Sequence, residues 1–123
     1  MIFHAIDVIG LKSLATIREA INEFCEEAEK AEPDIVRLQE IDFEIHRRFI
    51  QAGGNKTMLF MHNTIRHTYR KTLKLFEALM EDPPLIARYY RQTIEAMEAE
   101  DKTAAKVAMQ GYFQYGYSML TER

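Results

Sequence analysis

Hydrophobic residues recur at intervals of three and four along most of this chain, the spacing that places side chains on one face of an α-helix. Alternation of apolar and polar residues never lasts long enough to indicate a strand. Residues that favour helix starts precede or open five such stretches: Ser13, Pro33, Asn55, Asp82-Pro83-Pro84 and Asp101. The sequence therefore predicts an all-α fold, an antiparallel bundle of about five to six helices in a single domain over residues 1–123.

Composition narrows the class of protein. The 123 residues are 47% hydrophobic and 28% charged, as in soluble globular domains. No apolar run is long enough to span a bilayer, and the N-terminus lacks the basic region and long apolar core of a signal peptide, so we expect a cytoplasmic protein without membrane contact. The formal net charge of −3 argues against this chain binding nucleic acid by itself.

The stretch from Ile35 to Gln51 places polar side chains on an apolar face. Ile35, Leu38, Ile45 and Phe49 form one stripe at helical spacing, with Asp42 in its middle and His46 one turn further on. An inward carboxylate is costly unless another group pairs with it. Two interpretations are open: a structural Asp–His hydrogen bond, or half of a ligand or metal site that other helices complete.

The helix predicted after Asn55 also has a partly polar seam. Met58, His62, Ile65 and Tyr69 face inward on this count. On an adjoining side lies a basic row of Arg66, Arg70 and Lys74 at four-residue steps. Such a row is either a solvated face or an anion-binding edge.

The helix predicted after Asp101 changes character along its inner face. Small residues come first and aromatic residues follow, including Tyr112. Gly116 lies among these aromatics, where it would let a neighbouring helix or a ligand come close. An ordinary core is the alternative, but the glycine favours a cavity.

Spacing also bears on enzymatic alternatives. Di-iron bundles place a Glu three residues before a His, and none of the four histidines has an acidic residue there. The chain has no HExxH zinc helix, no GxSxG elbow and no glycine-rich phosphate loop. A polar, aromatic interior without a catalytic signature favours a binding module over an enzyme.

Two segments resemble a known family. The run D-F-E-I-H-R-R-F-I-Q-A-G-G-N from Asp42 to Asn55 resembles D-x-x-F-H-x-x-(apolar)-x-x-x-x-G-N of the FCD domain. Tyr90 to Tyr112, with I-E-A-M-E-A-E-D and A-A-K-V-A-M, resembles a later motif of the same domain. The FCD domain is the C-terminal, effector-sensing half of GntR-type transcription regulators of the FadR subfamily.

This resemblance implies a homodimeric helical bundle that binds a small acidic metabolite or a fatty acyl-coenzyme A in its centre. Many members hold a divalent metal there, such as zinc or nickel, through one Asp and three His. Carried over, the ligand positions are Asp42, His46, Tyr90 and Tyr112. Because neutral tyrosine is a poor ligand for these metals, we expect a metal-free site in which these four residues bond each other or an effector. The alternative is a weaker metal site with His62 as third ligand.

The acyl-coenzyme A branch of the family has modest further support. Asn63 stands six residues before Tyr69, as in that branch, and a methionine-rich interior suits an acyl chain. The basic row that includes Arg66 could meet phosphates. The family's winged helix-turn-helix domain is not expected within this chain, so DNA would be reached only through a separate N-terminal domain.

The leading hypothesis is therefore a non-enzymatic, effector-sensing and dimerisation domain that works by population shift. One competing hypothesis is a metal-dependent enzyme or metal-storage bundle that uses Asp42, His46 and His62. Another is a purely structural interaction module in which the polar seam is a satisfied hydrogen-bond network.

Overall fold

The computed structural model describes residues 6, 9–54, 56–70, 77 and 79–121. In these ranges the chain forms helices and no strand, which confirms the predicted all-α class. The labelled helices are α2 (Leu11–Ala28), α3 (Ile35–Ala52), α4 (Lys56–Arg70), α5 (Pro83–Glu98) and α6 (Lys102–Thr121). None of the helices in this part of the chain combines the length and apolarity needed to cross a membrane.

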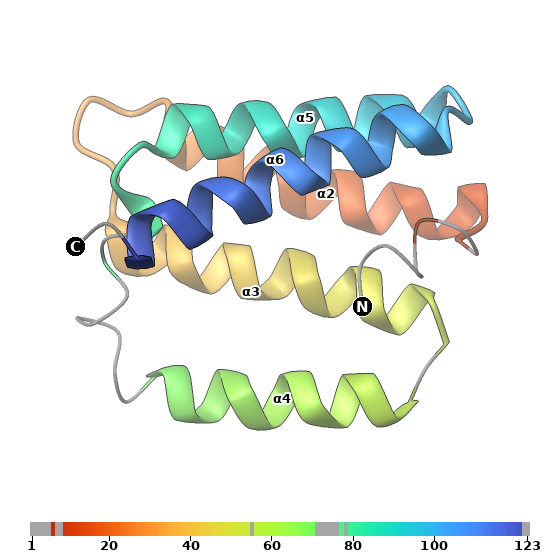
Figure 1. Ribbon diagram of the computed structural model, residues 1–123, viewed down its shortest axis with the longest axis horizontal. Coiled ribbons are helices and arrows are strands. Elements are labelled where there is room, and N and C mark those ends of the chain that lie inside the picture. Colours follow the sequence, from red (N-terminus) through yellow and green to blue (C-terminus); the bar gives the residue numbers. More distant parts are fainter. Residues whose placement is uncertain (1–5, 7–8, 55, 71–76, 78, 122–123) are drawn as a thin grey trace.

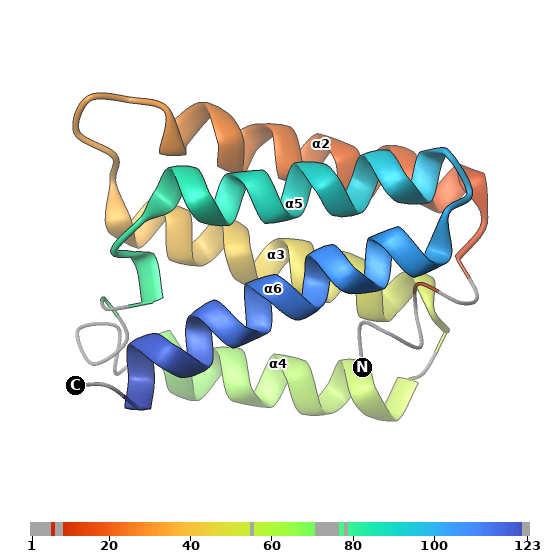
Figure 2. The same cartoon turned by 45° about the horizontal axis from the view of Figure 1, so that its top comes forward.

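Successive helices run in opposite directions, as predicted for an antiparallel bundle (Figure 1). α5 packs against α6 and α2, and α2 also packs against α3. α4 packs on α3, on the far side from α2 and α5 (Figures 1 and 2). The centre of the apolar core comes from the other four helices, with side chains such as Ile17, Phe24, Leu38, Phe49, Ile86, Ile94 and Met109.

Aspartates cap three of the helices. The Oδ1 atoms of Asp34, Asp82 and Asp101 accept hydrogen bonds from the backbone N–H groups three residues further on, at 3.2, 3.2 and 3.0 Å. Each bond satisfies a donor that the first turn leaves unpaired. The predicted starts at Asp82 and Asp101 are thus confirmed. α3 begins two residues after Pro33, because the carboxylate of Asp34 can cap and a proline side chain cannot.

The predicted cap at Ser13 is wrong. α2 starts at Leu11 with Gly10 at the N-cap position, and the backbone N–H of Ser13 bonds to the carbonyl of Gly10 at 3.1 Å. Ser13 therefore lies inside the first turn. The predicted cap at Asn55 falls outside the described residues, and so does the continuation of that helix over residues 71–76.

The inner face of α4 differs from its predicted seam. His62 faces inward as predicted and is 5% exposed, but Ile65, also predicted to face inward, is 51% exposed. Arg66 also turns toward α3, where it meets the carboxylates of Glu40 and Glu44. The polar face of α4 is inside because the facing surface of α3 is itself charged.

Candidate functional site

Three helices bring polar side chains together around Asp42 of α3. The hydroxyls of Tyr90 from α5 and Tyr112 from α6 both donate to Oδ1 of Asp42, the second at 2.7 Å. The Tyr112 oxygen lies 3.0 Å from Nε2 of His46. Because a hydroxyl has one proton, which Asp42 receives, Nε2 of His46 must be the donor in that contact. We call these four residues the Asp42 cluster.

Helical spacing and aromatic packing hold the Asp42 cluster in place. Asp42 and His46 are four residues apart on α3, so they share a face. The ring centroids of Tyr90 and Tyr112 are 5.1 Å apart, and those of His46 and Tyr112 are 5.4 Å apart. Phe24 of α2 packs edge-on against Tyr90, which is fully buried. The hydroxyls therefore reach Asp42 from rings that have little freedom to turn.

The surroundings determine which of these groups carry charge. Burial raises the pKa of the Tyr90 phenol well above its usual value, and the negative charge of Asp42 adds to the effect. Burial lowers the pKa of His46, against the opposing influence of Asp42 at 3.9 Å. At neutral pH the phenol of Tyr90 keeps its proton and His46 is uncharged. The negative charge of the cluster therefore lies on Asp42.

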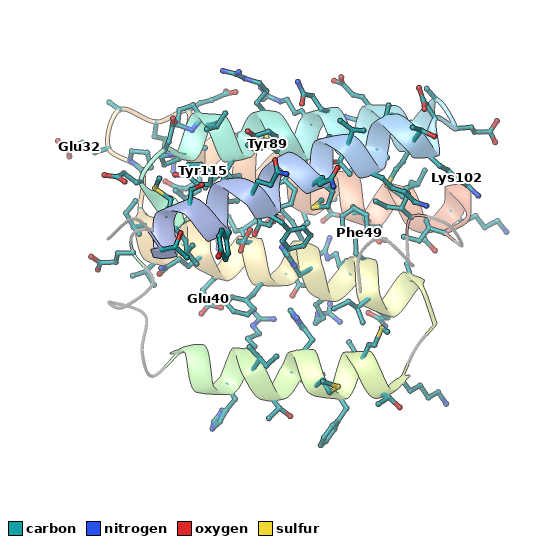
Figure 3. All side chains as sticks on the ribbon, viewed as in Figure 1. Glu32, Glu40, Phe49, Tyr89, Lys102 and Tyr115 are labelled. Carbon is teal, nitrogen blue, oxygen red and sulfur yellow. The ribbon has the colours of Figure 1, made fainter. Side chains whose placement is uncertain are left out.

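A cavity of about 230 Å³ opens beside the Asp42 cluster. Asp42 and Tyr112 line one part of it, together with Gly116, at which the sequence had favoured a cavity. Its other walls are the apolar Leu79, Met80 and Ile86 and the aromatic Phe113, Tyr115 and Tyr117. Tyr115, labelled on α6 in Figure 3, accepts a hydrogen bond from the backbone N–H of Asp82 at 3.0 Å. That bond ties the aromatic wall to the start of α5.

The remaining candidate residues lie outside this cavity or outside the described side chains. The His62 ring packs against Phe43 with centroids 5.6 Å apart, and its Nε2 atom has no hydrogen-bond partner among the described residues. Burial lowers the pKa of His62, and His46 adds to the effect. The side chain of Tyr69 is not among those described.

Arg66 belongs to a second polar group, on the side of α3 that faces α4. Its guanidinium contacts Glu40 at 3.1 Å and Glu44 at 3.2 Å. Glu44 also binds Arg47 and Arg48 of its own helix. These arginines, Arg47 foremost, lower the pKa of Glu44 to about 2. We call this set the Glu44 cluster; Figure 3 shows Glu40 on the same side of α3, toward α4.

The sequence pattern did not lead us to predict the Glu44 cluster. A signal for part of it exists, because Glu44 precedes Arg47 by three residues and Arg48 by four, the spacings at which opposite charges meet on a helix. The contact with Arg66 has no such local signal. It depends on how α4 docks on α3.

The residues of the Asp42 cluster do not fit the zinc or nickel site that the resemblance implies. Two of the four ligand positions are tyrosines, and both hydroxyls direct their protons at Oδ1 of Asp42. A protonated phenol is a poor ligand for either ion. In the described part of the chain, no three His, Cys, Asp or Glu side chains are grouped to hold a metal, and this includes the hypothetical triad of Asp42, His46 and His62.

A helical bundle with a small, largely apolar cavity beside a few convergent polar groups has the architecture of a ligand-binding domain. The family model of the FCD domain matches residues 2–115. This chain therefore belongs to the FCD domain family, the C-terminal, effector-binding domain of GntR-type regulators. No curated protein and no solved structure matches the chain.

Proposed function

We propose that residues 1–123 form one non-enzymatic sensor domain of a cytoplasmic, FadR-type regulator, and that it binds a small organic effector in the cavity beside Asp42. The observation that carries this proposal is the convergence of α3, α5 and α6 on one carboxylate at the cavity wall. A ligand that contacts Asp42 or Tyr112 acts on groups from different helices at once. Metal plays no part in the proposed binding.

The proposed mechanism is a shift between helix arrangements. A ligand changes such an equilibrium only by the difference between its affinities for the two states. The cavity is bounded by α6 and by the start of α5, so a ligand inside it favours one spacing of these helices. A separate DNA-binding domain attached to the sensor would report that spacing to the operator.

The cavity's size bears on the two effector classes that the resemblance implies. Its volume of about 230 Å³ lies below the roughly 300–1,000 Å³ of sites for drug-sized ligands. An acyl-coenzyme A is larger than such ligands, and Arg66, which was considered for its phosphates, is paired with Glu40 and Glu44. A small metabolite is therefore the better supported effector.

Ligand occupancy can be tested by filling the cavity. Among the described residues, a Cβ added at Gly116 would meet only Leu79 Cδ2, at 3.8 Å, so a larger side chain can enter the cavity without a clash with their backbone. We expect native mass spectrometry of the purified chain to show a bound small molecule that Gly116→Leu removes. Gln114→Leu is the matched control, because it adds the same side chain at an exposed position of α6.

The result that contradicts the proposal is equally definite. If Gly116→Leu keeps its helical circular dichroism and its melting temperature but still carries the ligand, the effector does not bind in this cavity. Elemental analysis of the same sample for zinc, nickel, manganese and iron tests the metal-free site. One metal per chain, lost in Asp42→Ala, would overturn it.

Dimerisation is the second part of the proposal. Large apolar side chains are exposed on α4, where Phe60, Met61 and Ile65 are each more than half exposed. Such exposure on a soluble domain is typical of an interface. We expect light scattering to give a dimer mass at micromolar concentration, and Phe60→Ser combined with Ile65→Ser to give a folded monomer. A monomer mass for the unmodified chain would refute dimerisation.

A further inference from the structure

The cavity beside Asp42 carries a charge pattern that indicates the class of its ligand. Of the described residues that line it, Asp42 is the only charged one. We infer that the cavity binds a small organic ammonium, a protonated amine on an apolar body, rather than a carboxylate. This inference rests on the proposed sensing function and names the ligand class for the same site.

Asp42 has an oxygen left for such a ligand. The hydroxyls of Tyr90 and Tyr112 both donate to Oδ1, and no described residue donates to Oδ2. An ionised carboxylate accepts hydrogen bonds at both oxygens and donates none. An ammonium group supplies the N–H donors that Oδ2 lacks, and it does so as a charge-assisted bond. A carboxylate ligand offers no proton to that oxygen.

The described arginines that face the same part of α3 are paired with carboxylates. Arg47 and Arg48 of α3 bind Glu44, and Arg66 of α4 binds Glu40 and Glu44. None of these guanidinium groups lines the cavity. Since no described cationic side chain lines the cavity, a carboxylate ligand there would face the like charge of Asp42. An ammonium ligand would instead neutralise the charge of Asp42.

The aromatic wall also favours a cation. Four aromatic residues of α6 line the cavity, namely Tyr112, Phe113, Tyr115 and Tyr117. The faces of such rings attract ammonium groups, most strongly where water is excluded. Phe113 packs edge-on against Tyr112 with centroids 5.1 Å apart, and the hydroxyl of Tyr115 is held by the backbone of Asp82. These contacts hold Tyr112, Phe113 and Tyr115 in the aromatic wall of the cavity.

Three probes of similar shape but different charge can separate the effect of ligand charge on affinity from the effect of ligand size. Phenethylamine, 2-phenylethanol and phenylacetate share a phenyl ring on a short chain and differ in bearing a cation, a neutral hydroxyl and an anion. We expect isothermal titration of the purified chain at pH 7.5 to show that phenethylamine binds at least about tenfold more tightly than 2-phenylethanol. Phenylacetate should bind more weakly than the alcohol.

Asp42→Asn removes the charge of the carboxylate while keeping its size and one acceptor oxygen. It should weaken phenethylamine binding by about tenfold or more and leave 2-phenylethanol binding within about twofold. Glu95→Gln is the control, since it removes an exposed carboxylate of α5 that does not line the cavity. If Asp42→Asn fails to fold, Tyr117→Leu serves instead. Tyr117 is 70% exposed, and its loss should weaken the amine more than the alcohol.

Two results overturn the inference in different ways. If phenylacetate binds most tightly and Gly116→Leu abolishes that binding, the cavity senses a small molecule but not an ammonium. If none of the three probes binds at millimolar concentration, the ammonium class is wrong. If, in addition, the native mass spectrum shows no bound molecule, the proposed sensing function fails with it.

Discussion

α3 carries a polar cluster on each of two faces, and the two clusters are built from different chemistry. Toward α5 and α6, one carboxylate is held by neutral hydroxyls from Tyr90 and Tyr112. Toward α4, the carboxylates of Glu40 and Glu44 are held by guanidinium groups. The first cluster keeps a net negative charge beside a cavity, whereas in the second each carboxylate is paired with at least one guanidinium group.

This difference shows how polar groups can serve two tasks on one helix. Neutral donors can hold Asp42 in place without neutralising it, so its charge remains available to a ligand. Arginine partners hold Glu44 in place and neutralise it. This face of α3 therefore binds α4 and leaves no free charge on Glu44 for a ligand. Because no described residue of α4 belongs to the apolar core cluster, we expect these ion pairs to contribute much of its attachment to α3.

Removing the carboxylate of the Asp42 cluster should have the largest effect on stability. Asp42→Ala leaves the buried hydroxyl of Tyr90 without its acceptor and breaks the bond from Tyr112. We expect urea unfolding to show a loss of about 2–3 kcal/mol in the free energy of unfolding. Glu95→Ala, at an exposed position, should change it by less than about 0.5 kcal/mol. A loss as small as that in Asp42→Ala would show that the cluster is not buried as described.

Acid should weaken the fold through the histidines on the two sides of α3. The pKa values of His46 and His62 lie below the ordinary value because both rings are buried. The unfolded chain therefore binds more protons as pH falls below about 6.5, and stability falls with it, by at most about 1.4 kcal/mol per pH unit for each histidine. Urea unfolding at pH 7.5, 6.5 and 5.5 measures the slope. His46→Gln should reduce it, and a stability that rises toward pH 5.5 would contradict the assignment.

Breaking the Glu44 cluster should loosen α4 without unfolding the core. Arg66→Met keeps an unbranched apolar stem but removes both ion pairs with Glu40 and Glu44. We expect a loss of about 1 kcal/mol and faster amide hydrogen exchange confined to α4. Arg37→Met is the control, because the contact of Arg37 with Glu23 is an exposed one at 3.9 Å. Equal acceleration of exchange in α2 and α5 would mean that α4 is part of the same cooperative unit.

The smallest expected effect is a change with salt concentration in the stability that each cluster contributes, and it should differ between the two clusters. Raising sodium chloride from 0.1 to 1 M shortens the screening length from about 10 to about 3 Å. The stability difference between the unmodified chain and Arg66→Met should shrink by a few tenths of a kcal/mol, since the pair is partly exposed. The difference for Asp42→Ala should not change, because neutral donors hold that carboxylate. Equal salt dependence in both variants would remove the distinction.

The sequence by itself determined the local structure of this protein. The periodic apolar residues, the aspartate caps at Asp82 and Asp101, and the glycines after α3 are sufficient to predict the helices and most of their ends. The four-residue step between Asp42 and His46 likewise predicts that they share a face. Such features depend on neighbours in the chain, which a reader of the sequence can see. The Ser13 cap was wrong because Gly10 itself takes the extended N-cap conformation, so that α2 begins at Leu11.

Only the tertiary structure decided which faces meet. The family resemblance linked Tyr90 and Tyr112 to Asp42, but only the packing of α5 and α6 shows that both hydroxyls donate to one of its oxygens. Periodicity likewise placed Ile65 inside, yet it is exposed and Arg66 turns inward. A helix pattern states which residues share a face but not what that face will contact. Arg66 faces inward because the opposing surface of α3 carries Glu40 and Glu44. A largely buried charge is stable only when an opposite charge pairs with it.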